Sequence, residues 1–272
     1  MGVIETAASP WGQSIPIHIS FALIWVMAIA GLAFLMGHAI WYQFMLKREP
    51  AEAVDPAAAA NLPEKIARHS LAARLFHWVM AAAMFALLIT AFLPRIGYPF
   101  AWVEYHWIAG LVLTASILYH VIHATFFMDF WSIWPDDIDR EDALRRLKRA
   151  RGEAAPPPRK FAKYPLENKM YHMIIVLAGL SVTITGLFMM KRVRTPFFTR
   201  NPYVFSDMTW GLMYVLHGLA GVGLIALIMV HIYFAVRPEK LAITRGMVLG
   251  SITREHYLEH HDPARWAPEP ER

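Results

Sequence analysis

Residues 214–236 read YVLHGLAGVGLIALIMVHIYFAV, and this stretch decides the fold class. It contains no Asp, Glu, Lys or Arg, and it is longer than the roughly 20 residues with which an α-helix crosses the hydrocarbon layer of a membrane. Its two histidines, His217 and His231, are 14 residues apart. In a helix this spacing turns both imidazoles toward nearly the same face, about 21 Å apart along the axis. The sequence therefore predicts a membrane helix with one histidine near each lipid surface.

Other long apolar stretches flank this one. A lipid-facing segment must satisfy its backbone hydrogen bonds internally, so each stretch is expected to be a helix. The composition agrees, because 57% of the residues are hydrophobic and only 17% are charged, against roughly 25% charged residues in an average soluble domain. We expect an all-α membrane protein with five transmembrane helices, the last four forming a four-helix bundle. The expected spans are about Ile17–Leu46, Leu75–Leu93, Trp102–Met128, Tyr171–Met190 and Trp210–Val236.

The segments between the spans define the expected organisation. Residues 51–72 are rich in Ala and Pro and are expected to form a linker after an N-terminal helix in residues 1–50. The four-helix domain is expected at 73–240, with a charged loop at 129–163, and a C-terminal tail at 241–272. Inside the loop, Asp136–Arg151 has an acidic start and a basic end, which suits a short helix.

The distribution of positive charge predicts the orientation of the chain. If five spans alternate across the membrane, 21 Lys and Arg residues lie on the side of the C-terminus and five on the other side. Because cytoplasmic loops are enriched in Lys and Arg, the C-terminus is expected in the cytoplasm and the N-terminus outside. The formal net charge of +5 reflects this one-sided pattern, and we expect the partners to include the lipid bilayer and no nucleic acid.

The complete lack of cysteine excludes several kinds of site. Without Cys the chain has no disulfide, no thiolate-bound iron–sulfur cluster, no covalently attached c-type haem and no Cys-based zinc site. An iron–sulfur cluster that exchanged electrons with this chain would therefore have to belong to a partner.

Histidines at matching depths suggest a pair of haems. His106 is expected at the depth of His217, and His77 at the depth of His231. Haem iron in an electron-transfer cytochrome takes two strong axial ligands, which two histidines on separate helices can supply. Gly110 follows His106 by four residues, and Gly221 follows His217 by four. These small residues leave space for a macrocycle, although glycine is also common where membrane helices pack.

His120 is an alternative ligand. It lies 14 residues after His106 and at the expected depth of His77, so two helices carrying His106 with His120 and His217 with His231 could also hold two haems. The remaining histidines of the spans are expected to be hydrogen-bonded packing residues, and those of the tail to be exposed. The two sets are His18, His38, His123 and His172 in the spans, and His256, His260 and His261 in the tail.

Several motifs resemble a known family, the gamma subunit (cytochrome b) of respiratory formate dehydrogenase, together with related quinone-linked cytochrome b subunits. The resemblance covers about residues 65–266. The motifs that carry it are ARLFHWVMAAAMFALLITAF at 73–92, EYHWIAG at 104–110, KYPLENKM at 163–170, the stretch at 214–236, and ITRGMVLGSITREHYLEHHDPARW at 243–266.

The resemblance implies a metal-binding electron-transport protein of the bacterial inner membrane with two b-type haems. Carried over residue by residue, the haem ligands fall on His106 with His217 on the outer side, and on His77 with His231 on the inner side. The resemblance further implies a periplasmic iron–sulfur subunit, a catalytic subunit that oxidises the substrate, and a quinone (ubiquinone or menaquinone) reduced near the inner haem. Arg74, one turn before His77, is a candidate partner for a haem propionate.

The expected quinone segment departs from the family pattern. The family has Asn after Lys-Tyr, where this chain has Pro165, and proline offers no side-chain hydrogen bond. Tyr164, Asn168 and Lys169 are the nearest polar candidates for quinone contact.

Three alternatives to this function remain open at the level of sequence. The chain could serve a quinol-oxidising enzyme such as thiosulfate reductase, with electrons flowing in the opposite direction. It could be a stand-alone carrier of the cytochrome b561 kind that needs no partner. It could also be a transporter without haem that uses membrane histidines for protons or metal.

Overall fold

The computed structural model describes residues 2–44, 60 and 62–268, and it divides into two compact units. Unit 1 consists of Met1–Leu46, Phe76–Tyr119 and Ile175–Phe234. Unit 2 consists of Lys47–Leu75, His120–Ile174 and Ala235–Arg272.

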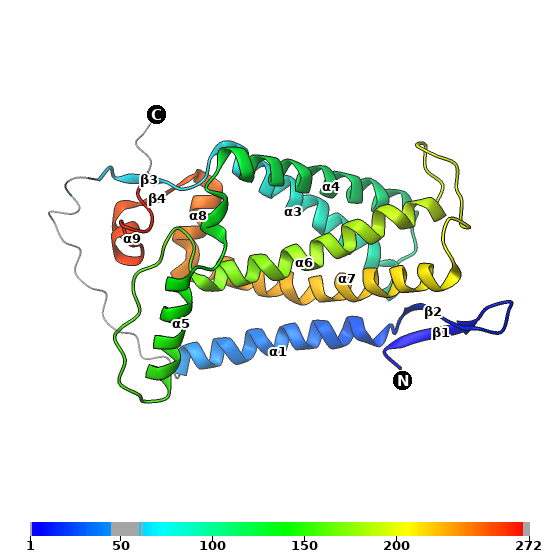
Figure 1. The fold of residues 1–272 in the computed structure, drawn as a ribbon, viewed down its shortest axis with the longest axis horizontal. Coiled ribbons are helices and arrows are strands. Elements are labelled where there is room, and N and C mark those ends of the chain that lie inside the picture. Colours follow the sequence, from blue (N-terminus) through cyan, green and yellow to red (C-terminus); the bar gives the residue numbers. More distant parts are fainter. Residues whose placement is uncertain (1, 45–59, 61, 269–272) are drawn as a thin grey trace. The chain divides into compact units, whose positions relative to one another are not determined.

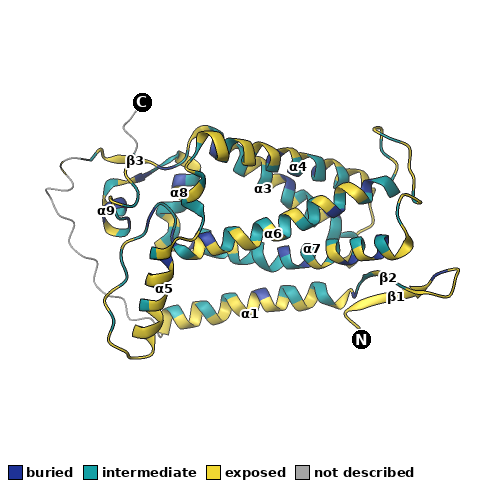
Figure 2. Cartoon of the chain, viewed as in Figure 1, coloured by how far each residue is buried: buried dark blue, intermediate teal, exposed yellow. Residues whose placement is uncertain are grey.

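Five long helices dominate the chain (Figure 1). Their most apolar windows have mean hydropathies of 1.6 to 2.3, and only 6% to 22% of those windows is buried inside the protein. Figure 2 shows the same helices mostly in the colours of exposed and intermediate residues. So much exposed apolar surface is stable only against lipid, which confirms the expected membrane protein with five spanning helices. The helices are α1 (Ala22–Phe44), α3 (Leu71–Phe92), α4 (Trp102–Phe127), α6 (Leu166–Met189) and α7 (Asp207–Val236).

The start of the first expected span is wrong. Residues Ile4–Ala8 and Ser14–Ile19 form an antiparallel hairpin of strands β1 and β2, and α1 begins only at Ala22. In SIPIHI every second residue is a β-branched isoleucine, and Pro16 has no N–H for a helix interior. His18, expected to open the helix, lies in β2 with its Nε2 3.5 Å from a carboxylate oxygen of Glu5.

Within unit 1 the hairpin packs directly on α7 (Figure 1). A Cβ atom on Gly211 would lie 2.0 Å from the carbonyl oxygen of Pro16, and one on Gly218 would lie 3.0 Å from a side-chain carbon of Ile19. Any residue larger than glycine at position 211 would therefore displace the strand. Because these two residues have no side chain, strand β2 can pack directly against α7.

Unit 2 contains a small domain-like core made of short elements. The three-residue strands β3 (Lys65–Ala67) and β4 (Ser251–Thr253) pair antiparallel, and α8 (Leu241–Leu249) and α9 (Arg254–His260) flank β4 in the chain. Strand β3 lies inside the expected linker 51–72, of which residues 51–59 and 61 lie outside the described residues. The core residues are Ile66, Ile252, Tyr257 and Leu258.

The charged loop of unit 2 contains the expected helix. Helix α5 (Asp137–Ala150) begins with a capping box, in which Asp136 and Asp139 each accept a hydrogen bond from the other's backbone N–H. Single 3-10 turns follow or precede the longer helices. They are η1 (Pro94–Ile96), η2 (Phe130–Ile133), η3 (Met190–Arg192) and η4 (Pro238–Lys240).

The tail histidine His261 is buried, contrary to the expectation from sequence. Its side chain is 1% exposed, its Nδ1 lies 2.7 Å from the Ala162 carbonyl oxygen, and its Nε2 lies 3.4 Å from Nη1 of Arg68. Both ring nitrogens thus have partners in the chain, which compensates the cost of burying them.

Candidate functional site

Two pairs of histidines face each other within unit 1. His106 on α4 and His217 on α7 have ring centroids 6.2 Å apart. His77 on α3 and His231 on α7 have ring centroids 6.4 Å apart. In each pair the two imidazoles come from different helices, and α7 contributes one histidine to each.

This separation suits a metal ion held between two imidazoles. Metal–nitrogen bonds to histidine are about 2.0 Å long, so an ion with two opposed imidazole ligands holds the ring centroids roughly 6 Å apart. Packed rings with nothing between them prefer a wider range of separations, roughly 4.5 to 7 Å. Both observed values fit an intervening ion, and two axial histidines are the ligand set of low-spin haem in electron-transfer proteins.

A threonine hydroxyl fixes the orientation of His106. Thr90 Oγ1 lies 2.8 Å from His106 Nδ1, and the same hydroxyl donates its hydrogen to the Ala86 carbonyl oxygen at 2.7 Å. Because the hydroxyl has one hydrogen and that hydrogen is used, it accepts the N–H of Nδ1. The lone pair of His106 is then on Nε2, the nitrogen that a metal would take.

The same arrangement recurs at His217. Thr185 Oγ1 lies 2.9 Å from His217 Nδ1 and donates to the Ser181 carbonyl oxygen at 2.5 Å. Thr90 and Thr185 are both buried. Our sequence analysis missed these two threonines, although a hydroxyl buried in an apolar span is itself a sign of a polar partner.

Glycines leave space around the histidines. A Cβ on Gly186 would lie 3.3 Å from Cε1 of His217, so a side chain there would press on the ring. A Cβ on Gly110 or on Gly221 would have its nearest neighbour only at 3.9 Å, which is ordinary contact. The role of Gly110 and Gly221 beside a macrocycle stays a prediction, and Gly186 is a residue in contact with His217 that the sequence analysis did not single out.

His120 has a different neighbour from the one considered in the alternative pairing. Its ring centroid lies 6.3 Å from that of His172, with both residues in unit 2. His231, the residue for which His120 would compete with His77, lies in unit 1 opposite His77.

Comparison with known proteins matches this helical core to a family. The family model described as "Prokaryotic cytochrome b561" matches residues 68–250, which include all four paired histidines. The chain belongs to this cytochrome b561 family. It is also 25% identical over 212 residues to the cytochrome b556 subunit of formate dehydrogenase from Haemophilus influenzae, covering 74% of this chain and 82% of the relative.

Membership of a cytochrome b family makes this chain a membrane electron-transfer protein with b-type haem. The long apolar helices agree with that membership, and so do the two histidine pairs, of which His106 and His217 have their lone pairs directed away from Thr90 and Thr185. The matched region begins at residue 68. The hairpin β1–β2 and helix α1 therefore lie outside the part of the chain that defines the family.

Arg74 is the candidate partner for a haem propionate in this cytochrome b. Part of its guanidinium group already makes a hydrogen bond within the chain. Its Nη1 donates to the Val248 carbonyl oxygen at 2.6 Å, within unit 2. Its Nε is buried without a hydrogen-bond partner among the described residues. The role of Arg74 stays a prediction.

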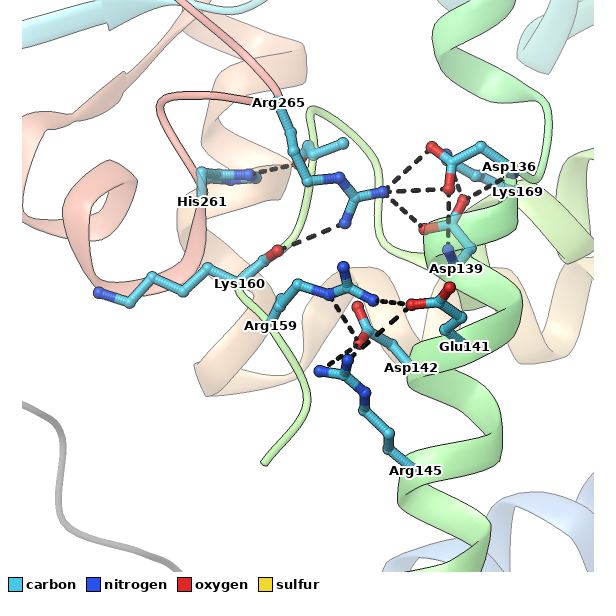
Figure 3. A network of polar contacts seen from close by, with 11 residues as sticks. Asp136, Asp139, Glu141, Asp142, Arg145, Arg159, Lys160, Lys169, His261 and Arg265 are labelled. Carbon is cyan, nitrogen blue, oxygen red and sulfur yellow. Dashed lines mark hydrogen bonds and ion pairs between the residues drawn. The ribbon is translucent and has the colours of Figure 1, made fainter. Parts of the chain in front are cut away.

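The three residues expected at the quinone site have distinct environments in unit 2. Lys169 is 1% exposed, and its Nζ lies 2.5 Å from Asp139 Oδ2 and 3.7 Å from Asp136 Oδ2 (Figure 3). The ring of Tyr164 lies under the guanidinium of Arg68 at 5.4 Å, and burial raises the pKa of the Tyr164 hydroxyl. Asn168 is exposed. Quinone contact by these residues stays a prediction, and the ammonium of Lys169 is already neutralised by two carboxylates.

Proposed function

We propose that this chain is the membrane-anchoring dihaem cytochrome b of a respiratory oxidoreductase similar to formate dehydrogenase. In this proposal His106 and His217 hold the haem near the outer surface, and His77 and His231 hold the haem near the inner surface. Electrons pass between a periplasmic iron–sulfur subunit and the quinone pool, ubiquinone or menaquinone.

One observation supports the proposal most strongly. The chain presents two imidazole pairs, each from separate helices, at 6.2 Å and 6.4 Å between ring centroids. In addition, buried threonine hydroxyls accept the Nδ1–H of His106 and of His217, which leaves Nε2 of each imidazole free to bind a metal, and simple packing of the rings would not require this.

The residues of the chain have distinct tasks in this function. A bound b-type haem supplies an iron that gains and loses single electrons. Two imidazoles would hold each of the two irons, those of His106 and His217 in one haem and those of His77 and His231 in the other. The hydroxyls of Thr90 and Thr185 hold two of the imidazoles in one tautomer and one orientation. The apolar helices keep water away, and so they restrict electron transfer to the cofactor sites.

The orientation follows from the asymmetry of positive charge. With 21 Lys and Arg residues on the side of the C-terminus and five on the other, we propose a bacterial inner-membrane protein with a periplasmic N-terminus. The pair His106–His217 then faces the periplasm, where an iron–sulfur partner can reach it.

The partners are inferred from the relative and from the composition. The relative's name assigns it to formate dehydrogenase, and this chain has no Cys for a cluster of its own. We therefore propose that a separate catalytic subunit oxidises a small substrate and that a separate iron–sulfur subunit relays its electrons. Reduction of one quinone to a quinol then consumes two of those electrons and two protons from the cytoplasm.

Haem content measured on purified variants tests this function. Wild-type chain is expected to contain two protoporphyrin haems. His106→Ala and His217→Ala should each abolish the outer haem, and His77→Ala and His231→Ala the inner one, while His120→Ala should keep both. A fully loaded wild-type preparation with a single haem, or loss of a haem from His120→Ala, would contradict the proposal.

The description of the matched family favours a second candidate, a stand-alone carrier of the cytochrome b561 kind. Such a carrier would take electrons from a small donor without any partner chain. The purified single chain in sealed vesicles distinguishes the two candidates. Rapid reduction of both haems by an external small-molecule donor such as ascorbate would favour the stand-alone carrier.

A further inference from the structure

A group of three nitrogen-containing rings lies in unit 2, and none of the three belongs to the four paired histidines. The ring centroid of His172, in the second turn of α6, lies 6.3 Å from that of His120 on α4 and 6.5 Å from that of Trp134. Both contacts are edge-to-face. Trp134 follows the 3-10 turn η2 (Phe130–Ile133), so three separate elements supply the three rings.

Two polar atoms of this group are buried without a hydrogen-bond partner among the described residues. They are Nε1 of Trp134 and Nδ1 of His172. A buried polar group without a partner costs about 1 to 3 kcal/mol, and native proteins rarely leave one unless water or a ligand satisfies it. Two such atoms on contacting side chains therefore leave two hydrogen-bonding positions open to a ligand or to water.

The chemistry of the two atoms limits what that ligand can be. The indole N–H of Trp134 only donates, so it requires an oxygen with a free lone pair. An imidazole nitrogen donates in one tautomer and accepts in the other, so His172 can bond either a carbonyl oxygen or a hydroxyl group. An indole N–H is not a metal ligand, which argues against a metal ion shared by the two rings.

The surroundings are accessible from lipid. Several apolar side chains next to the group in sequence are exposed, although they belong to membrane helices or to the turn that follows one. They are Phe126 (74%), Phe127 (76%), Trp131 (74%) and Met173 (38%). A ligand that reaches Trp134 and His172 along this surface must itself be soluble in lipid.

We propose that Trp134 and His172 bind the head group of a lipid-soluble quinone, with the ring of His120 forming part of the wall. This inference rests on the proposed function, which supplies the electrons. A quinone and its quinol differ by two electrons and two protons, and their oxygens change from acceptors to donors. Trp134 can donate to a lone pair of either form, and the two tautomers of His172 match the carbonyl of one form and the hydroxyl of the other.

This assignment differs from the polar residues expected from the sequence motif. Lys169 lies one helical turn before His172 on α6, and its ammonium is paired with Asp139 at 2.5 Å. Lys169 is thus placed to balance charge near the start of α6, whereas the two unsatisfied nitrogens belong to residues outside the motif KYPLENKM.

Equilibrium binding of decylubiquinone and of a short-chain menaquinone to the purified full-length chain tests the site. Trp134→Phe keeps the aromatic ring and removes only the N–H, and His172→Phe removes both ring nitrogens. Each variant is expected to weaken binding of at least one of the two quinones by about 10-fold. Trp25→Phe, on an exposed tryptophan of α1, should bind as the wild type does. Unchanged affinity in both site variants overturns the proposal.

Photolabelling uses only the wild-type chain, so its result does not depend on whether a variant folds. An azido-substituted quinone should label peptides within residues 120–134 or 166–176, and excess decylubiquinone should suppress that labelling. Labelling that excess phospholipid suppresses, but decylubiquinone does not, would show a lipid carbonyl at the site and overturn the proposal. Labelling confined to other peptides would do the same. Normal haem content in the same sample shows that such a failure concerns this site and not the proposed function.

Discussion

At the scale of single residues, the threonines behind His106 and His217 form a repeated arrangement. Each hydroxyl donates to the carbonyl four residues earlier in its own helix and accepts from an imidazole on the next helix along the chain. The helix backbone thereby dictates which nitrogen of each imidazole carries hydrogen. The tautomer needed for metal binding is present before any metal arrives.

Removing either hydroxyl should weaken haem binding at the pair it supports. In Thr90→Val and Thr185→Val the imidazole Nδ1 loses its acceptor, so part of the population adopts the tautomer that places hydrogen on Nε2. Loss of such a supporting hydrogen bond typically lowers metal affinity 10- to 100-fold. We expect one haem of the two to be depleted in each variant, measured by haem content after washing with a haem-binding protein.

Thr114→Val is the matched control for both variants. Thr114 Oγ1 also donates to the carbonyl four residues earlier, that of Gly110, at 2.7 Å. No described imidazole is its hydrogen-bond partner, so this substitution removes a hydroxyl from α4 without touching a histidine. Equal haem loss from Thr114→Val and Thr90→Val would show that the hydroxyl matters only for helix packing.

The buried His261 makes the stability of the tail depend on pH. Burial, together with the positive charge of Arg68, lowers its pKa from an ordinary value of 6.5 to about 3. Above pH 6.5 the imidazole is neutral in both the folded and the unfolded tail, and its contribution to stability is complete. Below pH 6.5 the unfolded tail takes up a proton that the folded tail refuses, so stability falls from pH 6.5 towards pH 3. The groups facing His261 are Arg68, Ala162, His256, Tyr257, His260 and Trp266.

Hydrogen exchange measured by mass spectrometry checks this dependence. Peptides within residues 251–266 are expected to exchange faster at pH 5 than at pH 7, after correction for the intrinsic rate. His261→Gln can still donate to Ala162 and accept from Arg68 but does not titrate, so it should reduce the difference. Burial also lowers the pKa of His256, to about 4. In the His261→Gln variant His256 still titrates, so the exchange rate of the tail should still depend on pH to a smaller extent. A wild-type tail with equal protection at both pH values would refute the argument.

At the scale of elements, helix α5 is attached to the start of α6 and to the tail by buried ion pairs. Asp139 is 6% exposed and contacts Lys169 Nζ at 2.5 Å and Arg265 Nη2 at 3.1 Å (Figure 3). Asp139→Ala leaves the buried Lys169 beside only the partly exposed Asp136. Removing one member of a buried pair typically costs about 3 to 5 kcal/mol.

The loss of stability can be measured by heating the protein in detergent and recording the temperature at which a protease begins to cut the tail and the loop. Asp139→Ala is expected to lower the temperature at which residues 129–163 become cleavable, while the haem spectrum stays unchanged. Asp137→Ala is the control, because Asp137 is 90% exposed and pairs with Arg140 at the surface. Identical behaviour of the two variants would mean that the buried pair does not attach α5.

The hairpin is the second element whose attachment can be tested. Gly211→Val places side-chain atoms where the Pro16 carbonyl oxygen lies, 2.0 Å from an ideal Cβ. Strand β2 must then leave α7, and a protease should cleave near Gly12 at the hairpin turn much faster than in the wild type. Gly223→Val, on the same helix with no described atom within 4 Å of its Cβ, should leave the hairpin protected. Retention of both haems by Gly211→Val would show that the hairpin is not needed for cofactor binding.

At the scale of the whole molecule, the sequence predicts the long apolar helices better than the short strands and the polar contacts between helices. The five spans follow from hydropathy and helix geometry, because lipid allows few alternatives. Helix geometry also places His106 at the depth of His217 and His77 at the depth of His231, but it leaves His120 open as a ligand, and only the family resemblance favours these pairs over it. The hairpin was hidden because its isoleucines continue the apolar run of α1. Thr90 and Thr185 were hidden because their partners lie 16 and 32 residues away, a distance that only the packing of helices closes.

The orientation of the whole chain gives the final prediction. A chain shortened to begin at residue 63 loses α1 and the hairpin but keeps the family region 68–250. Of the 21 Lys and Arg residues assigned to the C-terminal side, only Lys47 and Arg48 are lost, and the five on the other side all remain. The charge difference therefore still directs the C-terminus to the cytoplasm, and the new N-terminus must join it there. A fluorescent protein fused to the C-terminus should fold and fluoresce in both chains, whereas alkaline phosphatase in its place should be inactive. Active phosphatase on the shortened chain would mean that α1, and not the distribution of charge, sets the topology.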